Sequence, residues 1–156
     1  MFVFKIIPTT KSVSWFKKRN IDYKAMSYAT TLIFTQLVKS KKIVHREIKV
    51  KITNAYDSSY SFYTDRLFIS GVYDKEIYTR KKFVMEFFKH YLHELCHWYQ
   101  SEILKIRSSA INYTDKDFIL NTKKYRRNKW EIHARNFEKR FLRSFINYYA
   151  HYKIHF

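Results

Sequence analysis

Apolar and polar positions divide the first half of the chain into a strand, a helical region and a group of short strands. Residues 2–7 form an apolar run that stops at Pro8, which predicts a β-strand. Over residues 14–38 apolar side chains recur every three or four positions. This spacing predicts either one long helix or two shorter ones, with Asp22 as the cap of the second. Apolar residues that alternate with lysines, followed by turn-rich sequence, predict a meander of about three strands within residues 46–73.

The second half of the chain is dominated by two helical patterns. Residues 79–104 carry the stronger one, and residues 129–149 predict a last helix with Ile132 on its buried side. The polar segment 106–122 between them predicts a loop. This order predicts an α+β fold with a single domain over residues 1–156, in which a small antiparallel sheet packs on the long helix and on the C-terminal helix.

The scarcity of glycine and cysteine excludes several kinds of site. The 156 residues include one Gly, one Pro and one Cys. One Gly cannot form a glycine-rich phosphate loop, and one Cys can form neither an internal disulfide nor a Cys-only zinc site. No stretch approaches the roughly 18 uninterrupted apolar residues of a membrane helix, and the N-terminus lacks the features of a signal peptide. We therefore expect a cytoplasmic protein that is not secreted and has no membrane partner.

Charge raises the question of a nucleic-acid partner. Lys and Arg number 31 against 13 Asp and Glu, which gives a formal net charge of +18. The basic cluster of residues 123–129 could favour nucleic acid or acidic substrates. However, the basic residues are spread over both halves of the chain. The sequence is also rich in residues with AT-rich codons, as in many phages, viruses and AT-rich bacteria. Charge alone therefore does not identify the partner, and a phage or viral origin would place the protein in the host cytoplasm.

The sequence His93-Glu94-Leu95-Cys96-His97 is an H-E-x-x-H motif within the stronger helical pattern. Residues i and i+4 share one helix face, so both imidazoles can reach one ion. Glu94 lies about 100° around the helix from His93, where it can act on a water held by that ion. A zinc ion with three protein ligands keeps a fourth position for this water and lowers its pKa to about 7. Glu94 would take its proton and pass it to the leaving amine of a cleaved peptide.

The third ligand separates the classes of metallopeptidase. A chain of this composition is expected to contain only about 0.014 H-E-x-x-H motifs by chance. The metzincin extension would require Gly at position 100 and His at position 103. This chain has Gln100 and Ile103, so that class is excluded.

A later helix offers Glu131 and His133 as third ligands, and these point about 200° apart, so only one can face the ion. Asp115 and Asp117 in the preceding loop are further alternatives. Glu138 shares the face of Glu131 and is expected to support a ligand or to pair with an arginine rather than to bind the ion itself.

At this point the chain resembles the gluzincin-type metallopeptidases, in particular small phage and bacterial proteins of that kind. The matching residues are His93, Glu94, Leu95, His97, Gln100, Tyr125, Glu131, Ala134, Arg135, Phe137 and Glu138. The resemblance implies a minimal zincin-like fold in which His93, His97 and Glu131 bind Zn²⁺ and Glu94 is the general base. A peptide would lie along the sheet edge. Three histidine ligands would instead resemble the SprT/Spartan-like proteases, which act on proteins attached to DNA.

The function that we expect is hydrolysis of peptide bonds by a zinc metalloendopeptidase with a protein or peptide substrate. The alternatives are a nucleic-acid-associated SprT-like protease and a non-catalytic zinc protein that binds or inhibits a host factor. Among the other residues near the motif, His90 is expected to lie on the surface or to support a ligand, and Cys96 to pack in the core. Tyr113 and Tyr125 are alternatives for stabilising an oxyanion, although simple packing is the better explanation for either.

Overall fold

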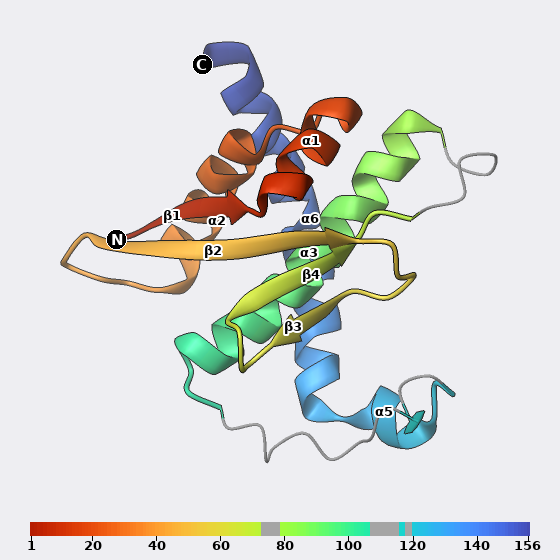
Figure 1. Cartoon of the computed structure of the whole chain (residues 1–156). Coiled ribbons are helices and arrows are strands. Elements are labelled where there is room, and N and C mark those ends of the chain that lie inside the picture. Colours follow the sequence, from red (N-terminus) through yellow and green to blue (C-terminus); the bar gives the residue numbers. More distant parts are fainter. Residues whose placement is uncertain (73–78, 107–115, 118–119) are drawn as a thin grey trace.

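The computed structural model describes residues 1–72, 79–106, 116–117 and 120–156, and these form an α+β domain (Figure 1). Its helices and strands follow in the order β1 (Phe2–Pro8), α1 (Thr10–Arg19), α2 (Tyr23–Leu37), β2 (Val44–Thr53), β3 (Ser59–Ser61), β4 (Arg66–Ser70), α3 (Arg80–Glu102), α5 (Lys123–Arg127) and α6 (Lys129–His155). The region for which the sequence predicted either one long helix or two shorter ones contains two helices, α1 and α2. Asp22 caps α2 as predicted, because its carboxylate accepts hydrogen bonds from the backbone N–H groups of Lys24 and Ala25.

The sheet has four strands in the order β1-β2-β4-β3, and most of its pairing is parallel. Strand β2 pairs parallel with both β1 and β4, and only the edge strand β3 pairs antiparallel with β4. The predicted antiparallel meander is therefore wrong. The crossover through α1 and α2 makes β1 and β2 parallel, and β4 inserts between β2 and β3 instead of following β3 at the edge.

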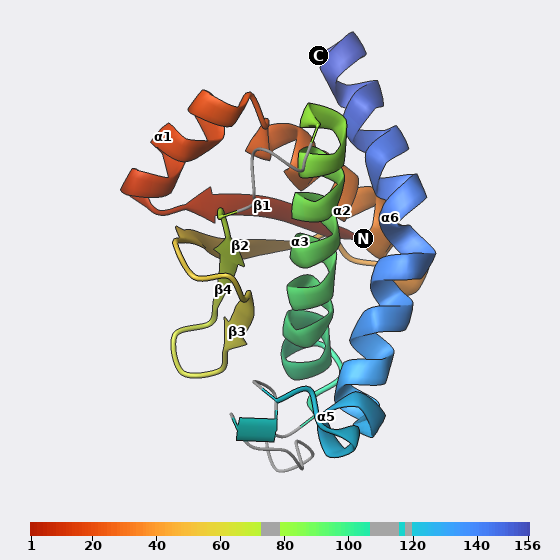
Figure 2. The ribbon, with the colours of Figure 1, turned by 90° about the vertical axis from the view of Figure 1, so that its right-hand side faces the viewer.

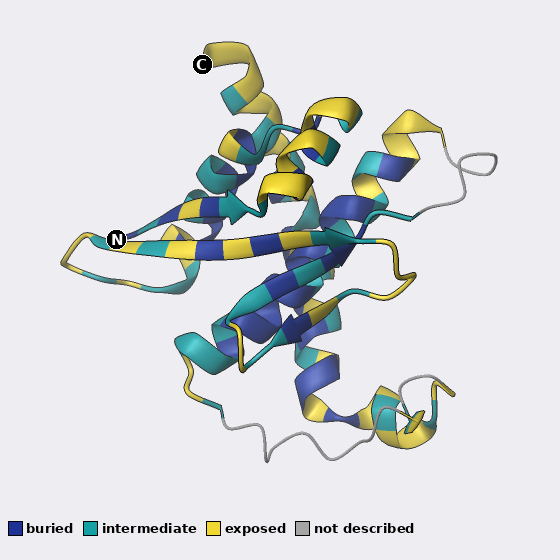
Figure 3. Cartoon of the chain, viewed as in Figure 1, coloured by how far each residue is buried: buried dark blue, intermediate teal, exposed yellow. Residues whose placement is uncertain are grey.

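Helices cover one face of this sheet in two layers (Figure 2). Helix α2 packs on β1, and α3 packs on β4 and β3, while α6 lies across both α2 and α3. Apolar side chains of β2 such as Ile48 and Val50 are buried beneath these helices. The intervening Lys49 and Lys51 are exposed on the opposite face, which no described helix covers (Figure 3).

Two local features fix the path of the chain around the helices. Gly71 follows β4 at a point where a Cβ atom would lie 2.5 Å from Ile52 Cγ2 and 2.9 Å from Trp15 Nε1, so only glycine fits there without a shift. At the start of α6 the side chain of Asn128 accepts a hydrogen bond from the backbone N–H of Trp130. Ile132, predicted on the buried side of this helix, is 39% exposed, because the helix turns Trp130 and Glu131 inward instead.

No described helix combines the length and the apolar composition needed to cross a membrane.

Candidate metal centre

Helix α3 places both histidines of the motif on the side that faces α6. Thr79 caps this helix through a hydrogen bond from the backbone N–H of Lys82, and the 23 residues of α3 continue without a break through the motif. The imidazole rings of His93 and His97 lie with their centroids 5.0 Å apart. The ring of His97 stacks on the indole of Trp130 at 4.8 Å, with only 8° between the planes. This contact joins α3 to the first turn of α6.

Glu131, in the first turn of α6, reaches both histidines. Its Oε2 lies 3.1 Å from His93 Nε2, and its Oε1 lies 3.3 Å from His97 Nε2. The carboxylate is 3% exposed. Tyr125 of α5 donates a hydrogen bond to Oε2 at 3.4 Å. Two imidazole nitrogens and one carboxylate from separate helices therefore converge on a single buried point.

The donors at this point fit a metal ion in both chemistry and spacing. One ligand atom from each of His93, His97 and Glu131 lies within 4.8 Å of the other two. Ligands of a tetrahedral zinc ion lie about 3.3 Å apart, given Zn–N and Zn–O distances of about 2.0–2.2 Å. Two imidazoles and a carboxylate form a donor set that zinc and other first-row divalent metals accept. This is the one such group among the described residues.

Hydrogen bonds to the far nitrogens orient both imidazole rings. Gln100 donates from Nε2 to the backbone carbonyl of Trp130 at 3.1 Å, so its Oε1 is the acceptor for His97 Nδ1 at 2.9 Å. His93 Nδ1 donates in the same way to Glu138 Oε2 at 2.9 Å. With the proton on Nδ1, the neutral form of each ring presents an unprotonated Nε2 to Glu131. Metal-binding histidines commonly donate such a hydrogen bond from the ring nitrogen that does not bind the metal.

The electrostatics of His93 show what the cluster requires when no metal is bound. Burial alone would lower the pKa of His93, but its hydrogen bonds to Glu131 and Glu138 outweigh this effect and raise the pKa to about 10. A positive charge is therefore favoured between these carboxylates. A proton on His93 supplies it in the metal-free protein, and a divalent cation would supply it more completely.

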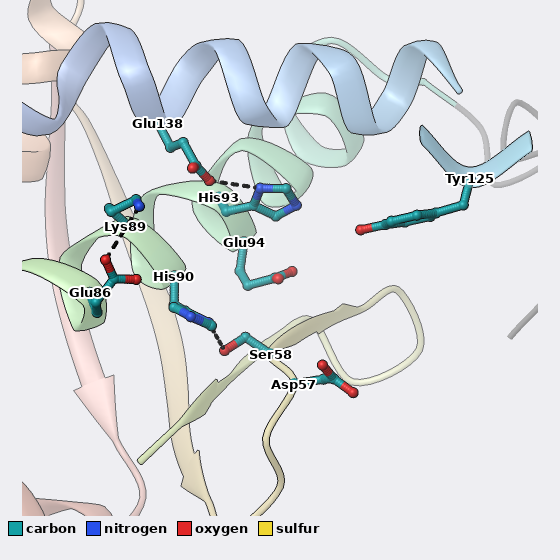
Figure 4. Close-up of a pocket in the computed structure, with 9 residues that line it drawn as sticks. All are labelled: Asp57, Ser58, Glu86, Lys89, His90, His93, Glu94, Tyr125 and Glu138. Atoms are coloured by element: carbon teal, nitrogen blue, oxygen red, sulfur yellow. Dashed lines mark hydrogen bonds and ion pairs between the residues drawn. The ribbon is translucent and has the colours of Figure 1, made fainter. Parts of the chain in front are cut away.

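Glu94 is buried next to these residues without a bonding partner. It is 5% exposed, and its carboxylate forms no hydrogen bond or ion pair within the described part of the chain. Burial is the main cause that raises its pKa, against the opposing effect of His97 and His93. The carboxylate points into a cavity of about 270 Å³, which also borders His93 and Tyr125 (Figure 4).

The structure separates the predicted third ligands. Glu131 joins His93 and His97, whereas His133 is not part of this group: its Nδ1 accepts a hydrogen bond from Gln100 Nε2 at 2.9 Å. Asp117 instead accepts a hydrogen bond from the hydroxyl of Thr122. Asp115 lies outside the described residues.

The remaining sequence predictions concern residues around the motif. Glu138 contacts His93 and not Arg135, which donates to the backbone carbonyl of Arg126. His90 is half-buried, and its Nδ1 lies 3.0 Å from the hydroxyl of Ser58. Tyr113 lies outside the described residues.

Cys96 is fully buried in the core, as predicted. Asp57 and Ser58, which precede the edge strand, border the same cavity as Glu94, and no sequence pattern predicted this. Neither belongs to a motif, and both lie more than thirty residues before Glu94 in the chain.

No known protein family matches the chain, and no curated protein or solved structure shows significant similarity to it.

Proposed function

We propose that this protein is a zinc-dependent metallopeptidase in which His93, His97 and Glu131 hold the ion and Glu94 is the general base. The observation that carries the proposal is the position of Glu94. Its side chain is 5% exposed, it forms no hydrogen bond or ion pair with a described residue, and it points into a cavity that borders His93 of the candidate metal group. A purely structural ion cluster would have no need for an unpaired carboxylate at its open side, because burying such a group costs free energy.

Each residue of the site has a separate role in the proposed hydrolysis of a peptide bond. A zinc ion held there would supply Lewis acidity, polarising a peptide carbonyl and lowering the pKa of a water. Glu94 takes a proton from the attacking water as the new C–O bond forms, and returns it to the amine nitrogen as the C–N bond breaks. Burial raises its pKa above that of a free carboxyl group, which suits a group that must accept a proton and then release it.

Tyr125 is suited to stabilise the reacting carbonyl group beside Glu94. Burial raises the pKa of its hydroxyl, with a further contribution from Glu131, so the group stays protonated and can donate a hydrogen bond. It borders the cavity beside Glu94 (Figure 4). A donor at this place can stabilise the negative charge that develops on the carbonyl oxygen. The resemblance of the motif to gluzincin-type metallopeptidases supports the assignment of His93, His97 and Glu131 as ligands and of Glu94 as the base.

The decisive variant is Glu94→Gln, assayed on a mixed peptide library with cleavage products identified by mass spectrometry. We expect the rate of hydrolysis to fall by about 10²–10⁴-fold with bound zinc unchanged, because the general base is lost and the ligands remain. Glu47→Gln is the matched control, since Glu47 is exposed on the open face of the sheet. Unchanged hydrolysis by the Glu94→Gln protein would refute the assignment of the base.

A second candidate function is nucleic-acid binding beside the hydrolytic site. The observation that favours it is the row of exposed lysines on the uncovered face of the sheet, Lys49 and Lys51 on β2 with Lys5 on the neighbouring β1. We expect binding of single-stranded DNA that weakens with salt and is reduced in Lys49→Glu/Lys51→Glu. Lys17→Glu/Lys18→Glu on α1 makes the same change in net charge. An equal loss in both double variants would point to net charge alone.

A further inference from the structure

The cavity beside Glu94 has a charge opposite to that of the rest of the molecule. The chain has only 13 acidic residues against 31 Lys and Arg, yet the described residues that border this cavity include four of the 13. They are Asp57, Glu86, Glu94 and Glu138. A composition that favours lysine works against such a concentration of carboxylates, so the bias that explains the basic surface cannot explain this cavity.

Two of these carboxylates, Asp57 and Glu94, form no ion pair with a described residue. Glu86 pairs at 3.4 Å with Lys89, which is the one lysine among the described residues that border the cavity. Glu138 uses Oε2 to hold His93, and Asp57 is exposed at the rim with no hydrogen bond or ion pair to a described residue. Leaving Glu94 aside, the described lining therefore holds three carboxylates against the ammonium group of Lys89 and the imidazole of His93 that pairs with Glu138, so Asp57 adds a negative charge that no described cation offsets.

The burial of Glu94 points independently to an occupant. The Glu94 side chain is 5% exposed, forms no hydrogen bond or ion pair with a described residue, and points into the same cavity (Figure 4). Isolated buried carboxylates are costly, so such a group is usually matched when a ligand enters. At about 270 Å³ the cavity is slightly smaller than the roughly 300–1,000 Å³ that accommodates a whole small-molecule ligand. One long side chain matches this size better.

We propose that the cavity bordered by Asp57, Glu86 and Glu138 is a subsite for a cationic side chain, lysine or arginine, of the polypeptide substrate. This inference rests on the proposed peptidase function and adds the substrate class. The ammonium or guanidinium group would lie among the carboxylates, and the aliphatic stem would pass Tyr125. A second metal ion is a weaker explanation, because the described residues contain no other group of three convergent ligands.

The test compares two peptides that differ only in lysine or norleucine beside the bond that wild type cleaves. We expect wild type to favour the lysine peptide by about tenfold in kcat/KM, which is the combined effect of two partly exposed ion pairs. In Asp57→Asn/Glu86→Gln the ratio should fall to about twofold or less, with the norleucine peptide cleaved as before. The Glu47→Gln control should keep the tenfold ratio. Equal cleavage of both peptides by wild type, or an unchanged ratio in the double variant, would overturn the subsite.

Two further measurements distinguish a failure of the subsite from a failure of the proposed peptidase function. Raising salt from about 50 mM to about 500 mM should reduce the preference of wild type for lysine, which tests the subsite without any variant, and a salt-independent preference would contradict it. Calorimetric binding to Glu94→Gln does not depend on turnover, and it can use two peptides of otherwise equal sequence that carry lysine or norleucine at one central position. A tenfold preference for the lysine peptide in that protein, with no hydrolysis of any peptide by wild type, would support the subsite and refute the peptidase. Hydrolysis without any preference would do the reverse.

Discussion

Two pairs of histidines in this chain share the i, i+4 spacing on a helix, and their surroundings differ in almost every other respect. They are His93 with His97 on α3, and His151 with His155 on α6. The ring centroids lie 5.0 Å apart in the first pair and 4.3 Å apart in the second, so the spacing brings both pairs together equally well. Spacing on a helix is therefore not what distinguishes them.

The difference lies in what holds the rings. The first pair is largely buried, each far nitrogen has an acceptor, and one carboxylate reaches both near nitrogens. The second pair is exposed, and neither imidazole forms a hydrogen bond or ion pair with a described residue. The ring of His151 stacks on Tyr28 and lies beside the ring of His155. A metal site thus needs the carboxylate and the orienting groups as much as it needs the pair of histidines.

The largest expected difference between the two histidine pairs is in zinc binding. We expect wild type to bind about one zinc ion per chain and His97→Ala to bind almost none, because two remaining donors make a weak site. His155→Ala removes one histidine from the exposed pair in the same way. It should keep the full zinc content in elemental analysis after dialysis. A comparable loss in both variants would mean that the two pairs are equivalent.

A smaller loss of zinc affinity should follow when a group that orients a histidine is removed and all three ligands are kept. In Gln100→Leu, His97 loses the acceptor that fixes its proton on Nδ1. We expect zinc affinity to fall by about 10–100-fold, measured by competition with a fluorescent chelator. Glu138→Gln, which weakens the same support for His93, should fall in this range too. Wild-type affinity in both variants would show that the buried pair needs no orientation.

The last effect concerns the stability of the metal-free protein. The folded-state pKa of His93 is raised to about 10, so the stability that its protonation provides is complete below pH ~6.5 and lost as pH rises toward 10. We expect the free energy of unfolding to fall by up to about 5 kcal/mol across this window in the presence of a chelator.

Two variants define that pH dependence. Glu138→Gln should flatten it, because one of the two hydrogen bonds that raise the pKa is weakened. His151→Ala should leave it unchanged, since His151 is exposed. The free energy of unfolding of wild type and both variants is measured with denaturant at several pH values. A wild-type free energy that does not change with pH would contradict the proposed charge balance at His93.

The helices could be predicted from the sequence better than the order of the strands. Apolar spacing and the cap at Asp22 determine where α2 begins, since both act within a few residues. Alternation in β2 predicted which of its side chains are buried, but not that β4 would lie beside it. Strand order depends on how the crossover helices pack, and no local pattern records that.

The candidate site was predictable as far as its motif extends. The H-E-x-x-H spacing brings together two histidines and places Glu94 beside them, and the resemblance added Glu131. The stacking of Trp130 on His97 and the contribution of Asp57 to the cavity could not be predicted. Both come from elements that meet α3 only in the folded chain. The acidic character of the cavity was hidden in the same way, because its carboxylates are scattered from residue 57 to residue 138.

The most direct test of the central claim is the zinc content of wild type, Glu131→Ala and His133→Ala, purified and dialysed in parallel. Glu131 and His133 lie two residues apart on α6 and both are near the motif helix, but only Glu131 faces the two histidines. We predict about one zinc per chain in wild type and in His133→Ala, and a near-complete loss in Glu131→Ala. A wild-type protein without zinc, or a loss in His133→Ala with zinc retained in Glu131→Ala, would contradict the account.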